Sequence, residues 1–143
     1  MARWRILGVL LAGAAALAAP AQAAAPNYIL VSGPGLKQPV LLDDWGENGE
    51  LLVAIRNGPT AKRPALRGLA RRPRLDLAEF WGWGDRPRPT RPSQANQHGW
   101  FYPARPGKRA LFQVTVEGTK APRLATRPAL AILARHGVPT RIT

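Results

Sequence analysis

Few residues in this chain could carry out hydrolytic chemistry, because histidine and serine are scarce. The chain has two histidines, His98 and His136, and two serines, Ser32 and Ser93. Neither serine stands at the centre of a Gly-x-Ser-x-Gly motif, the strand-to-helix turn that exposes a nucleophilic hydroxyl in many hydrolases. His136 falls where a helix is expected to end, and an imidazolium there interacts favourably with the helix dipole. The pattern predicts turn-forming serines and a helix-capping His136.

His98 is the remaining candidate for acid–base catalysis. Amide side chains stand shortly before it, at Gln94, Asn96 and Gln97, and an aromatic segment follows. Such a composition fits the rim of a pocket, and it also fits a solvated polar loop. As a pocket residue, His98 would work with a carboxylate such as Asp76 or Asp43, in a small hydrolase or lyase acting on an envelope polymer.

The absence of cysteine closes several further chemistries. A chain without thiols has no thiolate nucleophile, no thiolate metal site and no disulfide exchange. The acidic segment 43–50 lacks calcium-loop spacing, since a loop begun at Asp44 would place Ile55 at the twelfth, bidentate position. Gly33-Pro34-Gly35 lacks the third glycine and the Lys-Ser/Thr ending of nucleotide-binding loops. We therefore expect neither a metal nor a cofactor.

Positive charge is the one global signal. The chain has 21 Lys and Arg residues against 8 Asp and Glu, a formal net charge of +13. Seven cations and no acid lie between Glu50 and Asp76, where three prolines prevent one long helix, so we expect an exposed, mobile stretch. Such a surface attracts polyanions through counterion release. The candidate anion-binding residues are Arg67, Arg71, Arg72 and Arg74.

A compositional origin of the charge is the alternative. Arginine supplies 17 of the 21 cations beside abundant Ala, Gly and Pro, which a GC-rich coding sequence gives without selection for binding. No motif of a sequence-specific nucleic-acid-binding fold is present. If the charge is functional, it predicts anionic polymers or a membrane surface as partners rather than a specific nucleic acid.

Three tryptophans suggest a different binding surface. Trp81, Trp83 and Trp100 stand near arginines and could stack on sugars, as in a carbohydrate-binding module, provided that their rings are exposed and coplanar. Large aliphatic residues are few between residues 78 and 110, so the same rings could instead form the core of a small domain.

The first 23 residues predict a secretory signal peptide. Arg3 and Arg5 precede a 14-residue apolar run from Ile6 to Ala19, and Ala21-Gln22-Ala23 provides a small-residue cleavage site. The run is shorter than the about 20 apolar residues of a transmembrane helix. We expect cleavage between Ala23 and Ala24 and a secreted or periplasmic product, the alternative being an uncleaved N-terminal anchor. Without Arg3 and Arg5 the charge falls from +13 to +11.

Residues 24–143 predict a single α+β domain of short, mostly antiparallel strands with one C-terminal helix and long Pro/Arg-rich loops. Strands are expected at 28–32, 39–42, 75–81, 100–102 and 110–116, with the last two paired around a loop. Residues 33–35 predict a type II turn, and residues 43–50 an acidic loop containing the turn pair Asn48-Gly49. Segment 50–56 could be a strand, but its spacing favours a helix. Residues 126–137 predict a helix with a capping Thr126 and a Gly137 stop.

Four phrases of the chain resemble small exported bacterial proteins without an assigned activity. They are ILVSGPGL (29–36), PVLLD (39–43), QANQHGWFYP (94–103) and LARHGVPTRI (133–142). The resemblance implies export and a single domain, and it assigns no functional residue. With the charge, it leads us to expect a non-enzymatic exported protein whose basic surface binds anionic envelope or extracellular polymers.

Overall fold

The computed structural model describes residues 25–143. The expected signal peptide and its cleavage site, Ala23 and Ala24, lie outside the described residues. The described chain forms one six-stranded sheet in the order β2-β1-β3-β4-β5-β6, antiparallel at every pairing. The strands are β1 (Tyr28–Ser32), β2 (Val40–Leu42), β3 (Leu75–Phe80), β4 (Gln97–Tyr102), β5 (Leu111–Gln113) and β6 (Arg123–Leu124).

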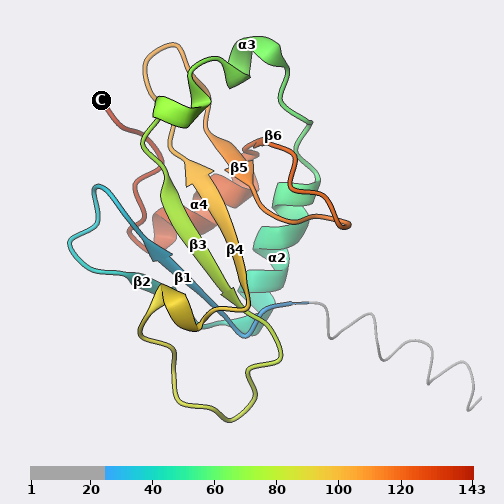
Figure 1. The fold of residues 1–143 in the computed structure, drawn as a ribbon, viewed down its shortest axis with the longest axis vertical. Coiled ribbons are helices and arrows are strands. Elements are labelled where there is room, and N and C mark those ends of the chain that lie inside the picture. The colour runs from blue at the N-terminus through green and yellow to red at the C-terminus, as the bar shows by residue number, and fades with distance from the viewer. Residues whose placement is uncertain (1–24) are drawn as a thin grey trace, which may run out of the picture.

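Two helices cover one face of this sheet. They are α2 (Trp45–Arg56) and α4 (Arg127–Arg135), and in Figure 1 α4 lies behind the strands. The main core lies between them and the sheet, where Ile29, Leu77 and Phe101 pack with Leu51 of α2 and Leu133 of α4. Glu47 of α2 pairs with Arg135 and His136 at the end of α4, which ties the helices together. No helix within residues 25–143 has the length and hydrophobicity to cross a bilayer.

Within residues 25–143, the opposite face of the sheet is covered at its two ends. At one end the connection from β3 to β4, which includes the 3₁₀ turn η3 (Pro92–Gln94), packs Trp83 and Ala95 on Phe80. At the other end, α3 (Arg63–Leu66) and the 3₁₀ turn η2 (Leu69–Arg71) pack on Tyr102 and Leu111. Figure 1 shows α3 and η3 at opposite ends of the strands.

The α+β prediction is confirmed, and several local signals explain why. Leu36 N donates to Gly33 O and Gly35 has a φ of 89°, so Pro34-Gly35 occupies the centre of the expected type II turn. Thr126 caps α4 through Ala129 N, and Gly137 ends that helix with a φ of 78°. β4 and β5 pair across a long loop, also as expected.

The expected acidic loop at 43–50 is wrong, because most of that segment is helical. α2 begins at Trp45, and the side chain of Asp44 accepts a hydrogen bond from Glu47 N as its N-cap. The amide of Asn48 donates to the backbone oxygens of Pro26 and Leu42, at 3.1 and 3.2 Å. These bonds to other parts of the chain fix Asn48 inside a helix, although Asn48-Gly49 is a turn pair in local sequence terms.

Candidate functional site

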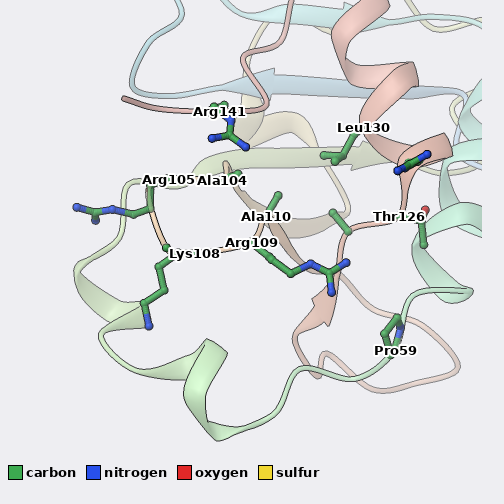
Figure 2. Close-up of a pocket in the computed structure, with 12 residues that line it drawn as sticks. Pro59, Ala104, Arg105, Lys108, Arg109, Ala110, Thr126, Leu130 and Arg141 are labelled. Atoms are coloured by element: carbon green, nitrogen blue, oxygen red, sulfur yellow. The ribbon is translucent and has the colours of Figure 1, made fainter.

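A basic hollow opens between the β4–β5 loop and the start of α4. Its volume is about 490 Å³, within the size range of small-molecule sites. Five of its lining residues are cationic and none is acidic: Arg105, Lys108, Arg109, Arg127 and Arg141. Pro59 and Thr126 close its side, as Figure 2 shows. We call this space the basic hollow.

The cations of the basic hollow carry uncompensated charge. Within residues 25–143 the ion pairs are Arg88 with Asp43, His98 with Asp76, and Glu47 with Arg135 and His136, and none involves a residue of the hollow. Clustered like charges without counter-ions raise the local positive potential. An anion entering the hollow would therefore meet guanidinium groups that no carboxylate of residues 25–143 holds in an ion pair.

The β4–β5 loop presents three of these cations from a fixed turn. Arg105 N donates to Lys108 O at 3.0 Å and Lys108 N to Arg105 O at 2.8 Å. Pro106 and Gly107 form the tip between them, and Gly107 has the φ of 73° that glycine adopts at low cost. The C-terminal segment holds the base of the loop, because Ala104 N donates to Thr140 O and Ile142 N donates to Ala104 O.

Arg72 also holds the β4–β5 loop, through hydrogen bonds to the backbone at both of its ends. Its Nη2 donates to Pro103 O at 2.8 Å and to Arg109 O at 3.0 Å, so that one guanidinium joins both ends of the loop. Arg72 is 6% exposed, and burial, together with the nearby charge of Arg105, lowers its pKa. The expectation that Arg72 lies in an exposed, mobile stretch is wrong. Its two hydrogen bonds to backbone carbonyls give Arg72 a structural role.

The other expected anion-binding arginines have separate positions. Arg67 and Arg71 are exposed at α3 and η2, and neither lines the basic hollow. The guanidinium carbon of Arg74 stacks 4.2 Å from the centre of the Trp100 ring, and Lys120 Nζ lies 4.5 Å from the same centre. The stretch expected to act as one patch is thus divided between surface, core and an aromatic contact.

The three tryptophans do not form one platform. Trp81 donates from Nε1 to Glu79 Oε1 and lines a small hollow beside α2, on the helix side of the sheet. Trp83 stands edge-on to Phe80 in the cluster of the opposite face, with 5.0 Å between ring centres. Trp100 lies on that opposite face beside Arg74 and Lys120. The coplanar arrangement that would favour a carbohydrate-binding module is not formed.

His98 and Asp76 come together on the open middle of the sheet. His98 Nδ1 lies 3.4 Å from Asp76 Oδ1, a long hydrogen bond between partly exposed side chains. Ser32 is the cross-strand neighbour of Asp76 on β1. The order across the strands puts the carboxylate between serine and histidine, so His98 could not take a proton from Ser32 as in a catalytic triad. Asp43 instead pairs with Arg88 at 3.1 Å.

Sequence reasoning missed the basic hollow because its cations do not form a run. Arg105 to Arg109 belong to one loop, Arg127 begins α4, and Arg141 lies in the C-terminal segment that pairs with Ala104. These three segments are separated in the sequence by strands or a helix, and only the fold brings their cations together. Comparisons with protein families, with curated proteins and with solved structures found no match for this chain.

Proposed function

We propose that this is an exported, non-enzymatic binding protein that holds anionic polymers of the cell envelope or the extracellular space. One observation carries the proposal: within residues 25–143, the basic hollow of about 490 Å³ is lined by five cationic residues and by no acidic residue, and none of the five forms an ion pair. Export rests on the signal sequence, and the partner class rests on this charge. Arginine suits the role because its planar fork matches the oxygens of phosphate and carboxylate groups.

A salt series on paired charge variants tests the proposal. Arg109→Gln with Arg141→Gln removes two charges from the basic hollow, whereas Arg67→Gln with Arg71→Gln removes two exposed charges elsewhere. Each lost phosphate-type contact lowers the slope of log affinity against log salt by about 0.7–0.9. For binding to phosphocellulose, we expect the magnitude of this slope to fall by about 1.4–1.8 in the variant that lacks Arg109 and Arg141. In the control variant the slope should change little.

Equal slopes for the wild type and both double variants would contradict the proposal and make the charge a compositional feature. A larger loss from the Arg67 and Arg71 pair would place binding on the stretch before β3 instead of the hollow. Thermal melts of all three proteins serve as the control for folding. Because all four substituted arginines are exposed, the melting temperatures should agree closely.

A second candidate function rests on the contact between His98 and Asp76. In a hydrolase, Asp76 would orient the imidazole and His98 would act as a general base toward water. If a screen of envelope glycans, peptidoglycan fragments and esters detects turnover, His98→Ala should lower its rate by about 10²–10⁴. Asp76→Asn should also lower it, through the orientation of the ring. Unchanged turnover in the His98 variant would remove this residue from the reaction.

A further inference from the structure

A second hollow adjoins the basic hollow across the β4–β5 loop. Its volume is about 530 Å³, and it shares Pro59, Gly107, Lys108 and Arg109 with the basic hollow. It adds Lys62 and the first turn of α3, and no carboxylate lines it. We call it the α3 hollow. Because four residues border both spaces, the two hollows are neighbouring parts of one surface depression.

Two consecutive residues of the loop direct their charges to different sides. In Figure 2 the guanidinium of Arg109 reaches into the space between Pro59 and Thr126, whereas Lys108 extends from the loop in another direction. Lys108 Nζ donates to Pro64 O at 3.0 Å, which places its ammonium group at the α3 hollow. The charged end of Arg109 therefore lies at the basic hollow and that of Lys108 at the α3 hollow. Arg127 lines only the basic hollow, and Lys62 lines only the α3 hollow.

We infer that the two hollows form one trough for a linear chain of phosphate groups, an inference that rests on the proposed function and names its ligand. At about 30 Å³ per water molecule, the two hollows have the volumes of about 16 and about 18 water molecules, more than one phosphate occupies. Cations supplied by α4, the loop and the segment before α3 follow one another along the trough. A ligand with a charge on every unit matches this succession, whereas a compact anion would use one hollow only.

The trough is fixed before a ligand arrives. The Arg105–Lys108 turn is closed by two backbone hydrogen bonds, and Arg72 and the C-terminal segment hold the ends of the loop. Little backbone ordering is then needed on binding, so that each added phosphate contact contributes to affinity. A chain bound in both hollows also gains from the high effective concentration of its second half once the first half is bound.

The test compares phosphate ligands of increasing length at one salt concentration, by calorimetry with the protein as secreted. Orthophosphate, tripolyphosphate and long-chain polyphosphate are the probes, and poly(glycerol phosphate) distinguishes a phosphodiester chain from a phosphoanhydride chain. We expect affinity to rise with length. Lys62→Gln should weaken long-chain binding about three- to tenfold and orthophosphate binding by a smaller factor, whereas Arg109→Gln, at a residue that borders both hollows, should weaken binding at every length. Arg67→Gln, outside both hollows, is the matched control.

Three results would contradict the inference that the two hollows bind one chain of phosphate groups. The first is an equal affinity for tripolyphosphate and the long chain, and the second is an equal effect of Lys62→Gln and Arg67→Gln. The third is the same affinity and variant pattern with dextran sulfate, which would remove the preference for phosphate. In all three cases a persisting effect of Arg109→Gln would leave the proposed function intact. Loss of all anion binding in the salt series above would instead contradict the proposed function itself.

Discussion

Glu79 is the buried carboxylate of the described chain. It lies on β3 beside Ile29 and Gln97, is 2% exposed, and accepts one hydrogen bond from Trp81 Nε1, while its Oε2 has no partner within residues 25–143. Burial raises its pKa from 4.5 to about 6, and the hydrogen bond from Trp81 with the charges of Lys120 and His98 limits the rise. The folded protein therefore holds a proton that the unfolded chain releases at lower pH.

The free energy of unfolding should therefore depend on pH through Glu79. Between pH 4.5 and about 6 the folded state binds more protons than the unfolded state, so the contribution of this group to the free energy of unfolding falls as pH rises. The loss amounts to about 2 kcal/mol. Glu79→Gln stays neutral at every pH, so the stability of the wild type relative to this variant should fall by about that amount between pH 4 and pH 7.

Urea unfolding at the two pH values measures this difference. Glu50→Gln, an exposed change on α2 without an ion pair, is the control and should show no comparable trend. A pH dependence that is the same in the wild type and in Glu79→Gln would contradict the assigned burial of this carboxylate.

At the scale of elements, the β4–β5 loop depends on a residue outside it. Arg72→Ala would leave Pro103 O and Arg109 O without their buried donor and would empty the space of a large side chain. We expect a loss of about 2–4 kcal/mol in the free energy of unfolding. Arg71→Ala removes the adjacent, exposed arginine and should change stability by less than about 0.5 kcal/mol. Chemical denaturation of the two variants makes the comparison.

Equal stabilities of the two variants would show that Arg72 does not hold the loop. The expected difference also changes what a combined substitution of Arg67, Arg71, Arg72 and Arg74 means. The sequence places all four arginines in a stretch expected to be exposed, but Arg72 is buried, so such a variant should lose stability through this residue alone. Binding experiments on this stretch are therefore interpretable only when Arg72 is retained.

Elements with local signals were predictable from the sequence. β1 is a short β-favouring run before Pro34-Gly35, and α4 has Thr126, an early proline and Gly137 in the expected places. The first half of α2 was not predictable, because the bonds that fix Asn48 reach Pro26 and Leu42. Strand β3 was predicted at 75–81 from its alternation of residue types and spans Leu75–Phe80, although both of its faces are largely buried.

At the scale of the whole molecule, the charge is arranged by the fold rather than by the sequence order. Counting along the chain directs attention to the seven cations between Glu50 and Asp76. The structure instead brings Arg109, Arg127 and Arg141 from three separate segments to one hollow. The contact between His98 and Asp76 was predictable as one of two options, but the choice between Asp76 and Asp43 needed the pairing of β3 with β4.

The central claim is that anions bind in the basic hollow, and mapping their position on the folded protein tests it most directly. Tripolyphosphate can be titrated into uniformly ¹⁵N-labelled protein while the backbone amide resonances are followed. We predict saturable shifts at Gly107, Arg109 and Thr126, with Arg67 and Arg71 nearly unchanged. Shifts concentrated at Arg67 and Arg71, or uniformly small shifts at all exposed arginines without saturation, would contradict the claim.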